Sequence, residues 1–273
     1  MKKVKLFSFA LAALMLGACS SEDGIDNGGQ GTVLPGEKGY ISLAINLPTT
    51  PSTRANDDFD DGLPVEYAVN NATLLIFEGT DEASAKFAGG YDLGTITPNT
   101  VGGNITSTFK VTKEIKKPVN GDLYALVVVN RGDVLTTEDQ GATWKLNGTE
   151  LSALTTLSAF NATAQEIAAE KLYDTTDDGN GFFMTNAPLY SVPGGTVQPS
   201  NGNLSTLTLI NAENVYTTAA EAEANPAASV YVERAVAKVT VNGTNGNLGN
   251  NAGMTYTISG WTFDVTNKKT YLI

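Results

Sequence analysis

Short extended runs separated by turn residues are the feature that most constrains the fold of this 273-residue chain. In the segment 40–47, large apolar residues stand at every second position, namely Ile41, Leu43, Ile45 and Leu47. The segment 105–115 alternates similarly, and a period of two is typical of a β-strand with one buried face. By contrast, 72–77 and 123–129 are almost continuously apolar, as in strands covered on both faces. We therefore expect an all-β fold with these two strands at its centre.

Extended patterns continue towards the end of the sequence. Leu207 and Leu209 alternate with threonines, which predicts a half-buried strand with both leucines inward. In 230–241 the inward parity changes near Glu233 and Arg234, and a β-bulge would produce that shift. With a last run near the end of the sequence, the total reaches about seven or eight strands, enough for a two-sheet β-sandwich.

Helical patterns are sparse. The segment 151–173 predicts one or two short helices across an end of the sandwich, and 217–225, rich in Ala and Glu and stopped by a proline, predicts another. Two stretches rich in Gly, Pro and Asp, 24–39 and 48–62, have the composition of linkers. The strand 40–47 is thus expected to stand alone between two flexible stretches.

The N-terminus has the form of a lipoprotein signal. Lysines at positions 2, 3 and 5 precede an apolar core, 6–16, that is too short to be a permanent membrane helix. Leu16-Gly17-Ala18-Cys19 then places the chain's single cysteine behind two small residues. Cleavage before Cys19 would leave a thiol that can carry acyl chains and anchor a soluble domain to a membrane. The alternative is an ordinary buried cysteine after an ordinary signal.

Composition excludes several classes of function. Without histidine, and with no cysteine after Cys19, the chain cannot form a Ser-His-Asp or Cys-His nucleophile, a His or Cys metal site, or a disulfide. Acidic residues gather in 56–62 and 177–181, which have the composition of solvated turns. The net charge of −12 becomes −15 without the three signal lysines, leaving 14 basic against 29 acidic residues. Such a surface repels phosphate backbones, so we expect no nucleic-acid binding. Because the chain lacks these nucleophiles and its carboxylates gather in turns, we expect no catalysis either.

A candidate processing site lies in the second linker. Thr53-Arg54-Ala55 sits between prolines and the acidic run 56–62, where an arginine is expected to be exposed and extended. A trypsin-like protease requires such a conformation. Arg54 could equally be a plain loop residue.

Several features occur together in an order that characterises one bacterial family: the lipobox ending at Cys19, the lone strand 40–47, Thr53-Arg54-Ala55, and the runs 124–130, 181–186 and 232–239. In their order and spacing, the chain resembles the N-terminal part of Bacteroidales major fimbrial subunits, the fimbrillins of type V pili. The resemblance extends from Met1 to the last residue. No single motif is highly specific.

The resemblance implies a non-enzymatic structural subunit without a cofactor or metal, placed in a cell-surface fimbrium and supporting adhesion. Its fold would be a two-sheet, Greek-key-like β-sandwich of transthyretin type with one to three short helices. The implied organisation is a signal peptide 1–18, a propeptide 19–54 that includes the first strand 40–47, and an N-terminal β-sandwich domain 55–273. The family's second domain, which supplies the donor strand, is expected to be missing from this sequence, most simply by truncation.

The resemblance also implies a route of assembly. The precursor would be an outer-membrane lipoprotein held by Cys19, and an arginine-specific protease would cut between Arg54 and Ala55. Loss of 40–47 would expose unpaired backbone groups and the groove that its side chains filled, namely Ile41, Leu43, Ile45 and Leu47. A strand from another pilus subunit, of the same or an accessory kind, would then enter by β-strand addition.

Alternatives remain at this point. A permanently lipid-anchored, glycan-binding surface protein would keep its first strand and stack sugars on exposed aromatics such as Trp144, although Trp144 is better explained as sandwich core. A pilus anchor or tip subunit would share the fold. Arg131-Gly132-Asp133 has the form of an integrin-binding tripeptide and equally of a turn, and Asp174-Thr175-Thr176 resembles an acceptor for O-glycosylation.

Overall fold

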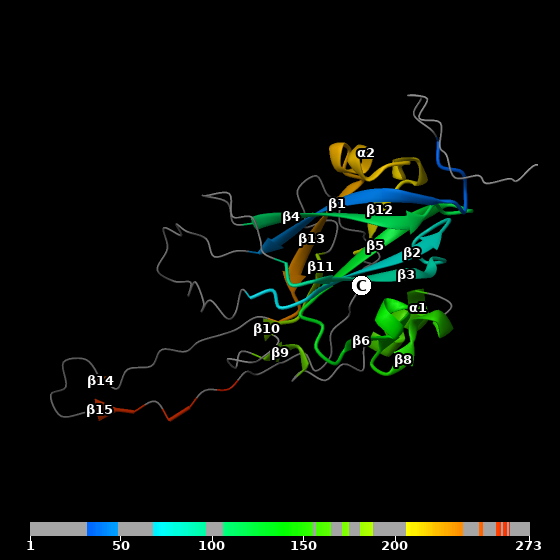
Figure 1. Cartoon of the computed structure of the whole chain (residues 1–273). Coiled ribbons are helices and arrows are strands. Elements are labelled where there is room, and N and C mark those ends of the chain that lie inside the picture. Colours follow the sequence, from blue (N-terminus) through cyan, green and yellow to red (C-terminus); the bar gives the residue numbers. More distant parts are fainter. Residues whose placement is uncertain are drawn as a thin grey trace, which may run out of the picture. The chain divides into compact units, whose positions relative to one another are not determined.

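A computed structural model of the chain describes residues 32–48, 68–96, 106–154, 157–164, 171–174, 181–187, 206–236, 246–247, 255–257, 259–260 and 262. Its largest element is a mixed sheet in which hydrogen-bonded neighbours follow the order β3-β2-β5-β11-β13-β1-β4, with β12 paired to β5. The strands are β1 Lys38–Pro48, β2 Ala72–Gly79, β3 Lys86–Gly94, β4 Thr106–Lys116, β5 Asp122–Val129, β11 Met184–Asn186, β12 Thr208–Ile210 and β13 Ala228–Arg234. The predicted all-β class is therefore confirmed (Figure 1).

Smaller elements surround this sheet. They are the strands β6 Leu135–Glu138, β7 Thr143–Leu146 and β8 Thr149–Glu150 in one small sheet, the pair β9 Tyr173–Asp174 and β10 Gly181–Phe182, the pair β14 Gly246–Asn247 and β15 Thr255–Tyr256, the helices α1 Leu157–Ala164 and α2 Ala219–Ala224, and 3-10 turns at Asp139–Gly141, Leu151–Ala153 and Ala212–Asn214. Within the described part of the chain, no helix is long and apolar enough to cross a membrane.

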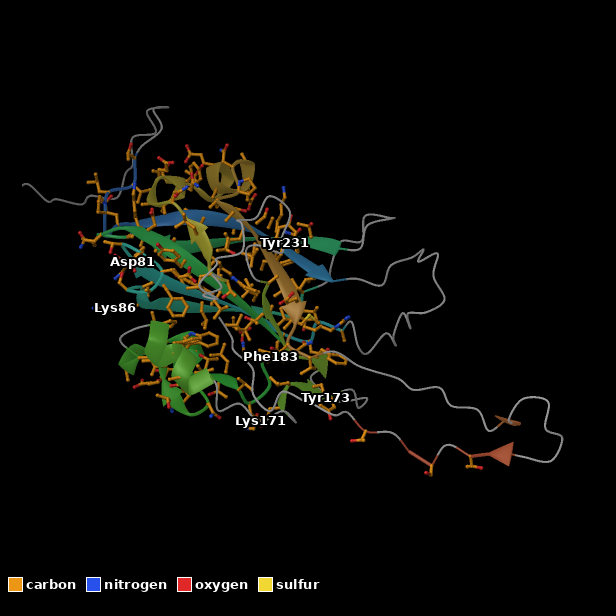
Figure 2. All side chains as sticks on the ribbon, turned by 180° about the vertical axis from the view of Figure 1, so that it is seen from behind. Asp81, Lys86, Lys171, Tyr173, Phe183 and Tyr231 are labelled. Atoms are coloured by element: carbon orange, nitrogen blue, oxygen red, sulfur yellow. The ribbon has the colours of Figure 1, made fainter. Side chains whose placement is uncertain are left out.

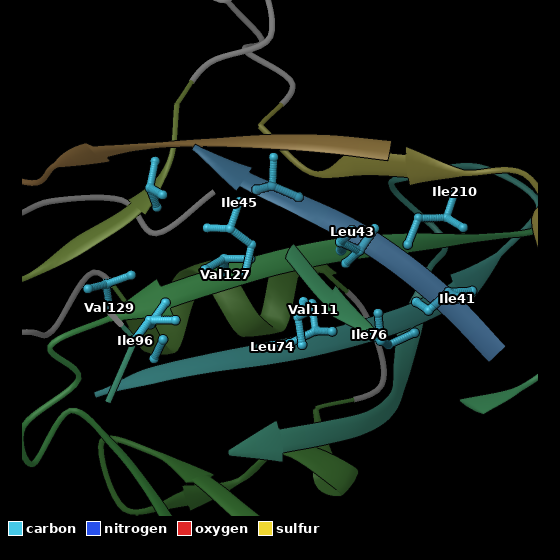
Figure 3. Close-up of a cluster of buried hydrophobic side chains, with 14 of the residues drawn as sticks. Ile41, Leu43, Ile45, Leu74, Ile76, Ile96, Val111, Val127, Val129 and Ile210 are labelled. Carbon is cyan, nitrogen blue, oxygen red and sulfur yellow. The ribbon is translucent and has the colours of Figure 1, made fainter. Parts of the chain in front are cut away.

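The sheet separates two apolar clusters, because β5 contributes alternate side chains to opposite faces. Leu123, Ala125, Val127 and Val129 join the first cluster, and Tyr124, Leu126 and Val128 join the second. The first cluster lies between β1 and β13 on one side and β2 and β5 on the other (Figure 3). As predicted, the nearly continuous apolar runs in β2 and β5 are buried on both faces.

Both predicted helical segments contain a helix. In α1, Phe160 reaches the second cluster and meets the Phe77 ring edge-on, with centroids 5.4 Å apart. The N-terminus of α2 is fixed by a capping box, since the Thr218 hydroxyl accepts a hydrogen bond from the Glu221 backbone N–H at 3.2 Å while the Glu221 carboxylate accepts from the Thr218 N–H. A helix of six residues needs such support, because it is too short to be stable by propensity alone.

Two details differ from the sequence predictions. Leu209 is 46% exposed, while Thr208 and Ile210 on either side of it are buried against β5, so the prediction that Leu209 points inward was wrong. Leu207 is buried in the second cluster as predicted, but it lies just before β12, so strict alternation does not tie its direction to that of Leu209. The segment 24–39 is not all linker, because β1 already begins at Lys38.

The parity change near Arg234 has a partial explanation. Val230 and Val232 belong to the first cluster, whereas Ala235 packs against the second, and the strand ends at Arg234. The side chains change clusters where the strand ends, and no bulge is seen within β13 itself. The rest of the predicted strand, from 237 to 241, lies outside the described residues.

Candidate functional site: the β1 position

The β1 position is the place between β4 and β13 that residues 38–48 occupy. All eleven residues of β1 pair antiparallel with β4, from Lys38 opposite Lys116 to Pro48 opposite Thr106. On the other edge, residues 43–46 pair in parallel with residues 228–231 of β13. This is the only parallel pairing among the described strands, and it leaves β1 hydrogen-bonded along both edges (Figure 1).

Further backbone hydrogen bonds hold the first half of β1. The Ser42 carbonyl accepts from the Ala227 N–H at 2.7 Å, and Tyr40 exchanges two bonds with Tyr216, at 2.7 and 2.8 Å. The edge of β1 that faces β13 is thus hydrogen-bonded to protein backbone over most of its length. Removing β1 would leave all of these groups without a partner.

The inner face of β1 is part of the first cluster. Its four apolar side chains are each at most 1% exposed: Ile41, Leu43, Ile45 and Leu47. Figure 3 shows three of them pointing towards β2, β5 and β12. Burying side chains of this size contributes roughly 1.5–3 kcal/mol each to the stability of the fold. Strand β1 is therefore part of the hydrophobic core, although it comes first in the sequence of strands.

The outer face of β1 is also covered, which corrects the prediction of a single buried face. Ser42 is fully buried and Asn46 nearly so. Helix α2 packs near β1 and β4, and the segments on either side of it bond to Tyr40 and Ser42, which places the helix at the Ser42 end of the strand. Asn46 is satisfied there: its Nδ2 donates to the Val230 carbonyl at 3.4 Å and its Oδ1 accepts from the Thr108 hydroxyl at 2.8 Å. The Ser42 hydroxyl has no hydrogen-bond partner among the described residues.

A glycine is required at the start of the strand. A Cβ atom at Gly39 would lie 2.7 Å from Val215 Cγ1, 2.9 Å from the Tyr216 carbonyl oxygen and 3.0 Å from Val33 Cγ2. Two of these contacts are with buried core side chains and one is with backbone, so none can move aside cheaply. The composition of 24–39 predicted a linker at this glycine. Its role follows only from the close approach of Val33, Val215 and Tyr216 in the folded chain.

Electrostatics contribute little at this site. Lys38 Nζ lies 2.7 Å from Glu114 Oε1 across the β1–β4 pair, and both side chains are well exposed. The hydrogen bond and charge of Glu114 raise the pKa of Lys38, and those of Lys38 lower the pKa of Glu114. An exposed pair of this kind contributes little to stability because water screens it. The β1 position is held by packing and backbone hydrogen bonds.

Strand β4 depends on β1. Among the described strands, β1 is the only one that pairs with β4, whose other edge is open. Lysines 110, 113 and 116 stand along β4, and charged side chains on an open edge oppose uncontrolled pairing with other chains. If β1 left and nothing replaced it, β4 would lose all of its sheet hydrogen bonds.

The residues predicted for lipid attachment and processing cannot be placed. Cys19, Arg54 and Ala55 lie outside the described residues, as do Thr175 and Thr176 of the possible glycosylation site. The predicted displaced side chains, by contrast, are brought together on one face of β1. Gly39, Ser42 and Asn46 were not predicted as site residues, because they read as linker or as a polar solvent face.

Two other sequence candidates are structural. Trp144 is 2% exposed in the second cluster, with its Nε1 donating to the Gly141 carbonyl at 2.9 Å, so it offers no platform for a sugar. Arg131 of the Arg-Gly-Asp tripeptide binds Asp92 at 2.8 Å and the Thr73 hydroxyl at 2.5 Å, and lies over the Trp144 ring. Its guanidinium is engaged within the fold and is not free for a receptor.

A hollow of about 800 Å³ opens near the start of β1, lined by ends of β2, β3 and β4. Lys86, labelled in Figure 2, is among its lining residues with Lys38, Glu78 and Glu114. Burial raises the pKa of Tyr91 in its wall, and the nearby Glu114 charge adds to the rise. Within the described ranges, no three His, Cys, Asp or Glu side chains are placed to hold a metal ion. This mixed lining shows no catalytic constellation.

No protein-family model matches the chain, and none of the curated proteins compared matches it. Two solved structures from Parabacteroides distasonis ATCC 8503 show distant likeness. A fimbrial assembly protein aligns at 12% identity and a TM-score of 0.35, over 73% of this chain and 52% of its own. A candidate cell adhesion protein aligns at 10% identity and a TM-score of 0.38, over 72% of this chain and 46% of its own. This chain thus spans about half the length of each, and likeness at this level carries no argument about its role.

Proposed function

We propose that this chain is the precursor of a structural subunit of a cell-surface fimbrium, exported as a lipoprotein and assembled by exchange of strand β1. An arginine-specific protease cuts after Arg54 and frees the shaft subunit from the lipid on Cys19. A strand from another subunit then takes the β1 position, and the resulting polymer supports adhesion. The proposal rests on one observation above all: β1 is bonded on both edges and buried on both faces, yet it precedes every other described strand in the sequence.

The connectivity supports exchange by a single cut. Residues 49–71 are the only covalent link between β1 and the rest of the sheet, and Arg54 lies six residues beyond Pro48 within that link. Cleavage there leaves β1 attached only through hydrogen bonds and packing. Everything before Ala55, including Cys19, would then depart with the strand as one piece.

The energetics support replacement over simple loss. An empty β1 position would expose four large apolar side-chain sites and the unpaired edges of β4 and β13. With roughly 1.5–3 kcal/mol for each lost apolar side chain, the deficit is comparable to the whole stability of a typical domain. The cut subunit therefore keeps β1 until a strand of similar shape arrives, and polymerisation follows by β-strand addition.

An anchor subunit of the same fold is the second candidate. It would retain the lipid on Cys19 and keep β1 in place, which the tight packing of the resident strand also favours. The glycan-binding alternative loses its named platform, because Trp144 is buried. Shaft and anchor subunits differ in a measurable property, the fate of residues 19–54.

The test replaces the arginine in the native cell. Arg54→Ala is expected to leave an uncut, lipidated precursor and to abolish surface filaments, measured by intact mass and by electron microscopy of the cell surface. Thr53→Ala is the matched control and should be cut and assembled normally. Arg54→Lys separates an arginine-specific protease, which would not cut it, from a general trypsin-like one. Filaments built from normally processed subunits in the Arg54→Ala strain would overturn the proposal.

A further inference from the structure

We infer that the β1 position selects its occupant by sequence as well as by hydrophobicity, and that helix α2 and the segment before it impose the selection. The occupant is an extended segment of another polypeptide that carries glycine, then large apolar residues alternating with small ones, then asparagine. The inference rests on the proposed strand exchange and adds the chemistry of the incoming strand. It is drawn from the two faces and two ends of β1.

The outer face requires small side chains. Ser42 is fully buried where α2 passes over β1, so a larger residue there would have to displace the helix. In α2, Ala222 is itself fully buried, so helix and strand meet through small residues on both sides. Close packing of this kind does not tolerate added methylene groups without strain. Hydrophobicity alone would favour a leucine at position 42, and the structure excludes it.

The two ends give the site a direction. At one end Gly39 is enclosed by Val33, Val215 and the Tyr216 carbonyl, which leaves no room for a Cβ. At the other end Asn46 joins the Val230 carbonyl and the Thr108 hydroxyl, a role that an apolar residue cannot fill. An occupant must therefore run with its glycine beside Val215 and its asparagine beside Val230. That direction is parallel to β13 and antiparallel to β4.

At the spacing of β1, with large apolar residues two, four and six positions after the glycine and asparagine seven positions after it, the printed sequence contains this order once. Gly260 is also followed by asparagine seven positions later, but its large apolar residues stand one position earlier and would face the opposite side of the sheet. None of its other glycines is followed, at the same spacing, by three large apolar residues alternating with small ones and then asparagine. Another segment of the same 273 residues therefore does not meet the requirements that β1 meets. A replacing strand that is not β1 of a second copy is therefore expected to come from another polypeptide, and the order can be used to search for it.

A strand-exchange experiment tests the inference on the full chain. The chain is cut after Arg54 with an arginine-specific protease, and the two pieces are left associated. A fluorescent peptide of residues 38–48 is then added in excess, and its entry and the release of the 1–54 piece are followed by anisotropy and size-exclusion chromatography. Variant peptides carry Ser42→Leu, Gly39→Val or Ser42→Ala, and one peptide has the residue order reversed.

The native and Ser42→Ala peptides are expected to enter, whereas Ser42→Leu, Gly39→Val and the reversed peptide should bind at least about tenfold more weakly. Lys38→Leu is the matched control, because it adds the same leucine at a position that is well exposed, and it should bind like the native peptide. Equal binding of the Ser42→Leu and native peptides would overturn the inference and leave strand exchange intact. Failure of the native peptide to enter would overturn the proposed exchange itself.

Discussion

At the scale of single residues, several buried polar side chains in this fold join segments that are distant in sequence through hydrogen bonds. Asn186 is the clearest case: its amide donates to the Ala125 and Thr206 carbonyls, and its Oδ1 accepts from the Val127 N–H at 2.8 Å. These bonds fix β11 against β5, where only one residue pair continues the ladder. Arg131 plays the same part for β2 and β3, where it bonds Thr73 and Asp92, which is why an apparent receptor motif is a structural one.

The Arg131–Asp92 pair makes a prediction about acid stability. The Arg131 hydrogen bond lowers the pKa of Asp92 in the folded chain below its unfolded value of about 3.9. The stabilisation is therefore complete above that unfolded value and is lost as pH falls through the lower, folded pKa. Asp92→Asn should reduce the free energy of unfolding by roughly 1 kcal/mol at pH 7 and flatten the decline at acid pH.

Urea unfolding from pH 7 to pH 2 measures this effect. Asp133→Asn is the matched control, since it removes an exposed carboxylate only two residues from Arg131. The control should follow the wild-type pH profile. If Asp92→Asn and the unmodified chain lost stability in parallel as pH fell, the ion pair would not be the source of the acid sensitivity.

At the scale of elements, period-two patterns predicted where the strands lie better than they predicted which face of each strand is buried. The runs in β2 and β5 were predicted as central, because only burial on both faces permits continuous apolar residues. The pattern of β1 predicted one face wrongly. Ser42 and Asn46 have the pattern of solvent-facing residues, yet both are buried, Ser42 beside α2 and Asn46 between Val230 and Thr108, all distant in sequence. No local signal distinguishes a small residue under a helix from a small residue in water. Leu209 failed for a related reason, since three residues are too few to fix a parity.

The dependence of β4 on β1 makes a prediction at this scale. When β1 is removed by cutting after Arg54 and gel filtration in mild denaturant, amides of β4 should lose most of their protection from hydrogen exchange. Amides of β2, which pairs with both β3 and β5, should lose less protection than those of β4 and serve as the internal control for global unfolding. Adding the 38–48 peptide should restore protection in β4. Full protection of β4 without β1 or the peptide would show that another partner holds it.

At the scale of the whole molecule, the proposed exchange requires a core that is completed by a segment which one cut can detach. The fold class and the buried strand 40–47 were predictable, because they depend on short-range patterns. The β1 position as a site was not, since it is formed by β4, β13, α2 and Gly39, which meet only in the folded chain. The processing residues Cys19 and Arg54 rest on sequence alone and remain predictions.

The most direct test of strand exchange is the intact mass and N-terminal sequence of the protein recovered, under native conditions, from filaments on its own cells. We predict a chain that begins at Ala55, carries no lipid and no longer has residues 38–48 bound to it. A chain that begins at acylated Cys19 and retains β1 within the filament would contradict this prediction.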